Sequence, residues 1–324
     1  MVTSASSASL DIVSFEPSMA AAWDRFVAEA KNGTFLLLRR YMDYHADRFV
    51  DRSLLWFQGS RLVAVLPACR QGDDLVSHAG LTYGGLIIGE RARTPLVVDI
   101  FRSLRTFLQR QSYERLIYKR VPYIYHRTPA EEDLYALYRA GATLSRRALS
   151  SALEPASRPR YSKGRRHGVR DAARLGIHVC ASTDYRQFMP IVTALLRTRY
   201  GQPPVHTAAE IQLLATRFPE NIRLFTASVD GVLEAGVIVY ETPRVAHVQY
   251  SAGTDKGRRV GALDCIYDFL ITDRYAGIRY FDFGASTDRH GTLNTGLLEY
   301  KESYGARAIA YETYELRPSS PCDL

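Results

Sequence analysis

Cysteine is scarce in this chain. Four cysteines occur, at Cys69, Cys180, Cys265 and Cys322, and no two of them form a C-x-x-C pair. Zinc sites and small disulfide frameworks need closely or regularly spaced cysteines. The sequence therefore indicates neither a metal site nor a disulfide framework, and it predicts a reducing compartment.

A secretion signal and a membrane span are also missing from the sequence. The first ten residues, MVTSASSASL, contain neither a basic region nor a long apolar core, so they are not typical of a signal peptide. No apolar run approaches the roughly 18 residues that a membrane helix needs. These absences predict a soluble, cytoplasmic protein.

Acidic residues are fewer than basic ones. The chain has 42 Lys and Arg against 34 Asp and Glu, a formal net charge of +8. Such an excess favours an anionic partner, and phosphates are the usual one: a coenzyme, a nucleotide-activated substrate, RNA or an anionic membrane surface. A soluble protein that is merely basic is the other interpretation.

Two segments of the chain follow one plan. The length of 324 residues and the 46% hydrophobic content suit two domains better than one. Apolar runs flank Gly59 in residues 53–68, and similar runs flank Asp230-Gly231 in residues 223–240. A turn glycine between alternating strands predicts a hairpin, because glycine takes positive φ without steric cost.

Each hairpin is followed by an amphipathic helix and a further strand. The helical stripes are Leu96, Ile100, Leu104, Phe107 and Leu108, and Leu263, Ile266, Tyr267 and Leu270. The strands after them are residues 114–121 and 278–285. This recurrence predicts a duplicated α/β module, with one copy in residues 1–155 and the other in 177–318. Chance similarity between ordinary α/β units is the alternative.

A basic segment, residues 156–176, separates the two predicted modules. It contains one acid, Asp171, against Arg158, Arg160, Lys163, Arg165, Arg166, Arg170 and Arg174. A helix is expected from about Tyr161 to Gly176. The helix is either a solvated linker or a rim that contacts phosphate through the forked donors of several guanidinium groups.

A basic, glycine-containing turn comes after the expected strand at residues 245–254. Arg258 and Arg259 precede Gly261, where a helix is expected to begin. Backbone N–H groups at such a position converge on a phosphate, and the helix dipole assists them. The turn has no P-loop pattern and the wrong glycines for a dinucleotide fingerprint. An ordinary strand-to-helix turn has the same features.

Strand, basic turn, helix and strand together resemble the core of the GNAT acyltransferases. The turn pattern of that family is [Q/R]-x-x-G-x-[G/A], and the sequence RRVGAL (258–263) matches it at Arg258 and Gly261 but departs from it at Leu263. The resemblance implies that acetyl-coenzyme A, as acyl donor, binds through its pyrophosphate at Arg258, Arg259, Gly261 and Ala262.

The C-terminal stretch resembles a narrower group. YFDFG (280–284) and YKESYG (300–305) are similar to the signature of chains with two fused GNAT modules. These include Fem-type transferases and GNAT-like proteins of polysaccharide gene clusters, although Ser303 and Tyr304 replace the Gly-Phe of Fem-type members. The resemblance implies an α/β (mixed α+β) fold of two tandem GNAT-like modules, each a mixed twisted sheet flanked by helices.

Such a site needs few chemical groups. A neutral amine attacks an activated carbonyl, and the resulting oxyanion must be stabilised. Lys301, or a backbone N–H where strands 245–253 and 279–285 splay apart, would donate to the oxyanion, and Asp282 is the candidate base. The alternatives are that Lys301 is a solvated helix residue paired with an acid and that Asp282 caps the following turn.

Polar groups of the first module are candidates for substrate recognition. Gly84 and Gly85 are expected to let a substrate approach the backbone closely. The groups expected to contact a sugar or an amino acid are His45, Tyr83, Tyr123, His126 and, in the second module, His206. Because tyrosine is abundant, with 21 residues, any single Tyr is more often a core residue than a ligand.

The resemblance leads to an expected function. We expect transfer of an acyl group, acetyl, from acetyl-coenzyme A to the amine of an amino sugar in a nucleotide-linked surface polysaccharide precursor. One alternative is a Fem-type transfer from aminoacyl-tRNA, which suits the basic residues 158–174 because phosphates dominate RNA affinity. Another is a non-catalytic RNA-binding or scaffold protein. The acceptor, the acyl chain and the oligomeric state are left open, and no metal is expected.

Overall fold

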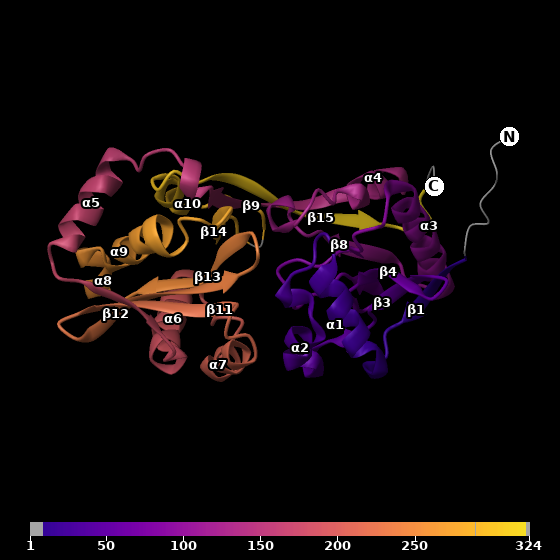
Figure 1. The fold of residues 1–324 in the computed structure, drawn as a ribbon, viewed down its shortest axis with the longest axis horizontal. Helices are drawn as coiled ribbons and strands as arrows, with labels where there is room; N and C mark the ends of the chain where they lie inside the picture. Colours follow the sequence, from indigo (N-terminus) through magenta and orange to yellow (C-terminus); the bar gives the residue numbers. More distant parts are fainter. Residues whose placement is uncertain (1–8, 289, 322–324) are drawn as a thin grey trace. The chain divides into compact units, whose positions relative to one another are not determined.

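The computed structural model describes residues 9–288 and 290–321. The chain divides into two compact units, residues 1–147 with 311–324 and residues 148–310 (Figure 1). It crosses between them within β9 (Thr143–Leu153) and β15 (Arg307–Leu316). The module bounds expected from the sequence, 1–155 and 177–318, remain a prediction. Cys322 and the first eight residues lie outside the described part.

The first unit contains a four-stranded antiparallel sheet. Its order is β1 (Leu10–Ser14), β3 (Leu54–Gln58), β4 (Arg61–Leu66) and β7 (Ile87–Ile88). β3 and β4 form the hairpin predicted for residues 53–68, and Gly59 in its turn has φ of +61°. The positive φ is the reason that a glycine is needed there.

A second group of strands completes the first unit. Its order is β15, β8 (Arg115–Lys119), β6 (Asp74–Val76), β5 (Cys69–Gln71) and β2 (Val50–Asp51). β6 and β8 are parallel, whereas the neighbouring pairs β15–β8, β6–β5 and β5–β2 are antiparallel. The helices of this unit are α1 (Ala20–Glu29), α2 (Arg39–Met42), α3 (Thr94–Arg110) and α4 (Glu132–Arg139).

Helix α3 packs by the stripe that its sequence predicted. Ile100, Leu104 and Leu108 are fully buried, and Leu96 and Phe107 are partly buried against the same core. This core also contains the inner faces of β3 and β4. The apolar stripe at a spacing of three to four residues thus fixes which side of the helix faces the sheet.

The second unit is built on one six-stranded sheet. Its order is β10 (His178–Ser182), β11 (Ile222–Val229), β12 (Val232–Glu241), β13 (Val245–Gly253), β14 (Tyr280–Ala285) and β9. Only β13 and β14 are parallel within it. The predicted hairpin at residues 223–240 is confirmed, with positive φ at both Asp230 and Gly231.

Helices cover both faces of this sheet (Figure 1). α9 (Ala262–Phe269) lies on one face, and α6 (Tyr185–Tyr200) and α7 (Ala208–Arg217) lie on the other. The basic segment forms α5 (Lys163–Ala173), which packs on α9. Two short helices, α8 (Asp255–Val260) and α10 (Thr295–Glu302), complete the unit. The predicted helix start near Gly261 is confirmed, since α9 begins at Ala262.

Candidate active site

The parallel pairing of β13 with β14 ends early. Val245, Ala246 and His247 pair with Tyr280, Phe281 and Asp282, and no later residues of the two strands are paired in the described ranges. β13 has an irregular register against β12 near Val248, and β14 has another against β9 between Asp282 and Ala285. Such bulges bend strands and re-aim side chains. The two strands therefore splay directly after His247 and Asp282.

Asp282 accepts hydrogen bonds on both carboxylate oxygens. Oδ1 accepts from Ser150 Oγ at 2.6 Å and from the backbone N–H of Gly284 at 2.9 Å, and Oδ2 lies 2.9 Å from His247 Nδ1. The carboxylate is fully buried. Burial of a charge is tolerated when its lone pairs are satisfied. The bond to Gly284 is the turn-capping contact expected as an alternative, and it coexists with the contact to His247.

The imidazole of His247 is the exposed end of this group. Its side chain keeps 13% of its surface accessible, whereas that of Asp282 keeps none. A hypothetical Cβ at Gly284 would lie 3.5 Å from His247 Cε1. The missing side chain at position 284 thus leaves space beside the ring. Sequence reasoning overlooked His247, because the contact depends on the register of two strands that are distant along the chain.

Lys301 is buried and anchors the end of β14. It is 4% exposed, so the interpretation as a solvated helix residue is wrong. Nζ donates to Gly284 O at 2.7 Å, Ala285 O at 2.9 Å and Ser286 Oγ at 3.0 Å. Burial lowers the pKa of the ammonium to about 8, and Asp282 acts in the opposite direction. These three acceptors match the three N–H groups of an ammonium.

The predicted phosphate turn lies at the junction of α8 and α9. Gly261 adopts φ of +75° between the two helices. Arg258 pairs with Asp255 and donates to Gly253 O at 3.1 Å, Arg259 is exposed, and the side chain of Ala262 is fully buried. The turn therefore has the predicted helix start, with one of its two arginines engaged locally.

Helix α5 packs against this turn at Gly261, whereas Arg258 and Arg259 stay exposed. A Cβ at Gly261 would lie 3.1 Å from the Cβ of the buried Ala172. Asp264, in the first turn of α9, pairs with Arg165 of α5 and accepts from Tyr300 and Tyr304 at 3.0 and 2.8 Å. An acid in the first turn already complements the helix dipole. The chain's own groups thus supply negative and positive charge where an anionic ligand would sit.

Comparison with known proteins follows the same division of the chain. A family model for the acetyltransferase (GNAT) domain matches residues 155–302. Residues 155–302 are therefore similar to a GNAT acetyltransferase domain. None of the curated proteins compared with the sequence matches it.

Solved structures agree with the GNAT fold over nearly the whole chain. FemX has a TM-score of 0.68 at 11% identity, with 95% of this chain and 97% of FemX covered. L-PGS from Bacillus licheniformis has a TM-score of 0.60 at 12% identity, with 94% and 93% covered. A tandem GNAT protein from the clavulanic acid biosynthesis pathway has a TM-score of 0.51 at 13% identity, with 97% of this chain and 100% of that protein covered. The fold is therefore two GNAT-like modules.

The first GNAT-like module uses its glycines internally. A Cβ at Gly84 would lie 2.2 Å from Ser77 O, and one at Gly85 would lie 2.9 Å from the ring of Tyr118. The expectation that these glycines admit a substrate to the backbone is wrong, because atoms of the protein fill the space. Gly85 also needs its positive φ of +74°.

The residues predicted to bind substrate are mostly interior ones. His45, Tyr83 and His126 are buried in the first unit, where Tyr83 donates to Thr34 Oγ1 at 3.1 Å and His126 Nε2 lies 3.0 Å from Val121 O. Burial lowers the pKa of His126 to about 4. Tyr123 is 47% exposed. In the second unit, His206 Nδ1 lies 2.7 Å from the hydroxyl of Tyr250. Their role in binding stays a prediction.

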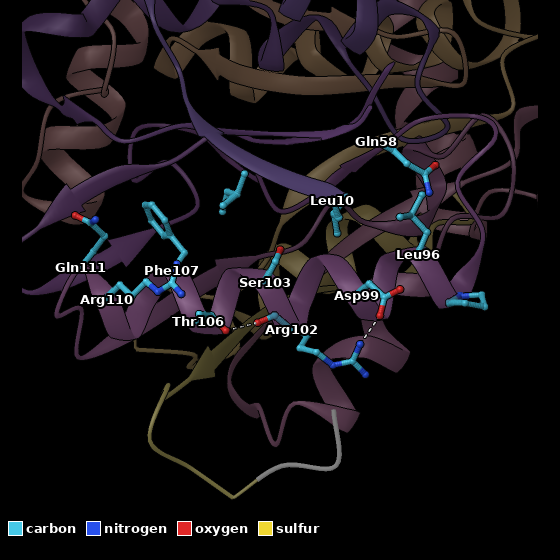
Figure 2. Close-up of a pocket in the computed structure, with 12 residues that line it drawn as sticks. Leu10, Gln58, Leu96, Asp99, Arg102, Ser103, Thr106, Phe107, Arg110 and Gln111 are labelled. Atoms are coloured by element: carbon cyan, nitrogen blue, oxygen red, sulfur yellow. Dashed lines mark hydrogen bonds and ion pairs between the residues drawn. The ribbon is translucent and has the colours of Figure 1, made fainter. Parts of the chain in front are cut away.

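The described residues also bear on metal binding, membrane insertion and surface pockets. In that part of the chain, no cluster of three or more His, Cys, Asp or Glu could hold a metal ion. Residues 9–288 and 290–321 also contain no helix with the length and apolar character of a membrane span. An open pocket of about 830 Å³ lies beside α3 in the first unit, lined by Leu10, Phe107 and Arg110 among others (Figure 2). It contains none of the predicted site residues.

Proposed function

We propose that the chain transfers an aminoacyl group from aminoacyl-tRNA to an amine at the splay of β13 and β14. The observation that carries the choice of donor is the packing of α5 against the turn at Gly261. Beside this turn, Asp264 of α9 pairs with Arg165 of α5, and Ala172 of α5 packs against Gly261. A coenzyme pyrophosphate bound there would displace α5 and would be repelled by the carboxylate of Asp264. The ester of an aminoacyl-tRNA needs no pyrophosphate-binding site at this turn.

The splay provides room and donors for the reaction. The amine attacks the ester carbonyl, and the oxyanion needs hydrogen-bond donors in fixed positions. Because the ladder between β13 and β14 stops at His247 and Asp282, backbone N–H groups of the following residues are not used by that ladder. Gly284 N–H already donates to Asp282 Oδ1, so we infer that N–H groups of β13 beyond His247 stabilise the oxyanion.

Lys301 acts indirectly in this scheme. Its three N–H groups donate to Gly284 O, Ala285 O and Ser286 Oγ. It has no further proton to donate to an oxyanion while these bonds persist. We therefore infer that Lys301 holds the backbone beyond Asp282 and adds positive charge to the site. This replaces the direct donor role expected from the sequence.

The exposed face of α5 suits an RNA donor. Lys163, Arg166 and Arg170 are exposed on it, and Arg165 is held inward by Asp264 and by Ser303 Oγ at 3.0 Å. Arg174 directly follows the helix and pairs with Asp171. One inward arginine thus fixes the helix while the others remain directed to solvent. Phosphate contacts dominate the affinity of proteins for nucleic acids.

Acetyl transfer from acetyl-coenzyme A to an amino sugar of a polysaccharide precursor is the second candidate. It is favoured by the acetyltransferase description of the family model for residues 155–302. The exposed Arg259 beside Gly261 would then contact phosphate after a shift of α5. The amino-sugar acceptor is compatible with either donor.

Two measurements separate the donors. We expect a pool of aminoacyl-tRNAs to raise the melting temperature and to lose its labelled amino acid to an amine acceptor, and acetyl-coenzyme A to do neither. Replacing Arg166 and Arg170 by Ala should weaken tRNA binding. It should also reduce the slope of log K against log salt concentration by about 0.7–0.9 per lost phosphate contact. Arg91→Ala with Arg110→Ala, an equal change of charge in the first unit, is the control.

Three results would count against this choice. Stabilisation and acetyl transfer by acetyl-coenzyme A alone would establish the second candidate. Tight tRNA binding without any transfer would favour the RNA-binding scaffold. An equal loss of tRNA affinity in the control variant would remove α5 from the binding surface.

A further inference from the structure

The contact of His247 with Asp282 assigns different roles to its two ring nitrogens. Nδ1 lies 2.9 Å from Asp282 Oδ2, and the other oxygen of that carboxylate already accepts from Ser150 Oγ and Gly284 N–H. An ionised carboxylate only accepts hydrogen bonds, so Nδ1 carries the proton that faces it. In the neutral imidazole, Nε2 is then left with a lone pair.

The surroundings leave that nitrogen within reach of a ligand. Asp282 is completely buried, so the group is approached only from the imidazole, whose side chain is 13% exposed. Gly284 lies two residues beyond Asp282 with φ of +79°, and a Cβ there would touch Val248 O at 3.4 Å and His247 Cε1 at 3.5 Å. The site thus combines a buried carboxylate, an oriented imidazole and a clear ring edge at the point where two strands part.

We propose that His247 is the proton shuttle of the transfer reaction and that Asp282 is its positioning residue. This inference rests on the proposed function for the identity of the reaction. The amine nitrogen forms a bond to the carbonyl carbon and gives its proton to Nε2 of His247. The C–O bond of the ester then breaks, and Nε2–H returns the proton to the departing sugar oxygen. One proton moves through one nitrogen, and no oxidant or reductant is needed.

An ester donor gives this shuttle a second task. An alkoxide is a much poorer leaving group than a thiolate, so its departure depends on protonation as the bond breaks. His247 therefore serves both halves of the reaction when the donor is an ester, and chiefly the first half when the donor is a thioester. The dependence of the rate on the leaving group is thus a readout of the shuttle.

The first test needs no substrate. In nitrogen-15 NMR of protein labelled at its eight histidines, we expect His247 as the tautomer with hydrogen on Nδ1 and none on Nε2. Asp282→Asn should weaken that preference, whereas His178→Gln, at an exposed position on β10, should leave the His247 signals unchanged. A neutral imidazole with its hydrogen on Nε2 and none on Nδ1 would overturn the proposal.

The second test compares reactions that do and do not need the shuttle. With aminoacyl-tRNA and glucosamine, His247→Gln should lower kcat by about 10²–10⁴ and leave KM unchanged. The leaving group of an aminoacyl p-nitrophenyl ester departs without protonation, and methoxyamine is a weakly basic amine that gives up its proton readily. With this pair of substrates, the kcat of the same variant should fall by less than about tenfold. His178→Gln is the control, and melting curves confirm folding. An equal loss in both reactions would mean a structural role and would overturn the proposal.

A wrong choice of donor gives a different pattern. If acetyl-coenzyme A replaces aminoacyl-tRNA as the donor that reacts, the tautomer of His247 still has hydrogen on Nδ1. With acetyl-coenzyme A as donor, His247→Gln should then still lower kcat with glucosamine and should lower it less with methoxyamine. That result supports the role of His247 and excludes tRNA as the donor. If the variant is unimpaired with whichever donor reacts, the shuttle fails regardless of donor.

Discussion

Within residues 9–288 and 290–321, each unit contains one pair of parallel strands, and the two pairs end differently. In the first unit the last paired residues of β6 and β8 are Val76 and Ile117. In the second, the last paired residues of β13 and β14 are His247 and Asp282. An apolar pair has no group that moves a proton, whereas the second pair is an imidazole with its carboxylate.

The segments directly beyond the two pairs also differ. After Val76, the N–H of Ser77 donates to Ile117 O at 2.9 Å, Ser77 Oγ accepts from Lys119 N at 2.7 Å, and Gly84 N–H donates to Lys119 O at 2.8 Å. In the second unit the strands part. In the described residues, the end of the β6–β8 pair is thus occupied by the chain's own loop, whereas the end of the β13–β14 pair holds an imidazole and a carboxylate.

One feature is common to both units. Lys119, which is partly buried, donates to Leu81 O and Ala79 O, and Lys301, which is buried, donates to Gly284 O and Ala285 O. Burial lowers the pKa of each to about 8. The anchoring lysine therefore belongs to the architecture of both modules, and its presence alone does not mark the reactive one.

The largest expected effect comes from the two strand-end pairs. Asp282→Asn should lower kcat by about 10²–10⁴, because the amide no longer fixes Nδ1–H on His247. Val76→Ala, at the matching place of the first unit, should cost about 1–3 kcal/mol of stability and leave the rate per folded molecule within about twofold. Transfer assays and urea unfolding of both variants check this. Similar losses of rate would mean that the first unit also takes part in catalysis.

The glycines beside these pairs give a smaller effect. Gly84→Ala should cost about 1–3 kcal/mol, because its Cβ would lie 2.2 Å from Ser77 O and overpacking strains a filled core. Gly284→Ala should cost about 1–2 kcal/mol through its φ of +79° and should also slow transfer, because the methyl group narrows the space beside His247. Unfolding and rate measurements on the two variants distinguish them. A slower Gly84→Ala enzyme would contradict the assignment.

The smallest effect concerns the two lysines. A base with a folded pKa near 8 and an ordinary value of about 10.4 keeps its proton longer in the unfolded state, so its contribution to stability rises with pH between these values. The free energy of unfolding of the wild type, relative to Lys119→Met or Lys301→Met, should therefore increase by about 1 kcal/mol from pH 8 to 9. Parallel urea titrations measure it. A flat difference for Lys301 would mean that it titrates normally.

Local pattern predicted much of the fold. Both hairpins, the stripe of α3, the start of α9 and the helix in the basic segment arise from turn glycines, apolar spacing and capping residues such as Ser162, whose hydroxyl accepts from Arg165 N. These signals act over a few residues, where steric and hydrogen-bond rules are strong. Asp282 and Lys301 were also identified from the sequence, although the structure alters the part that each plays.

The partners of those residues could not be predicted. His247 is the third residue of β13 and Asp282 the third of β14, so an in-register parallel pairing would have brought them together. No local sequence pattern indicates that the two strands are neighbours. Two irregularities of register also set the direction of their side chains. The role of Arg165 was hidden similarly, because Asp264 lies on another helix.

The sequence by itself determined where turns, helices and strands occur, and it supplied the charge that favours a phosphate-bearing partner. Only the tertiary structure decided which buried groups meet. Asp282 accepts hydrogen bonds from His247 and Ser150, and Lys301 donates to carbonyl groups at the end of β14. The turn at Gly261 packs against α5. The physical reason is that turn and helix signals are local, whereas a hydrogen bond between distant segments exists only after packing has fixed their distance and direction.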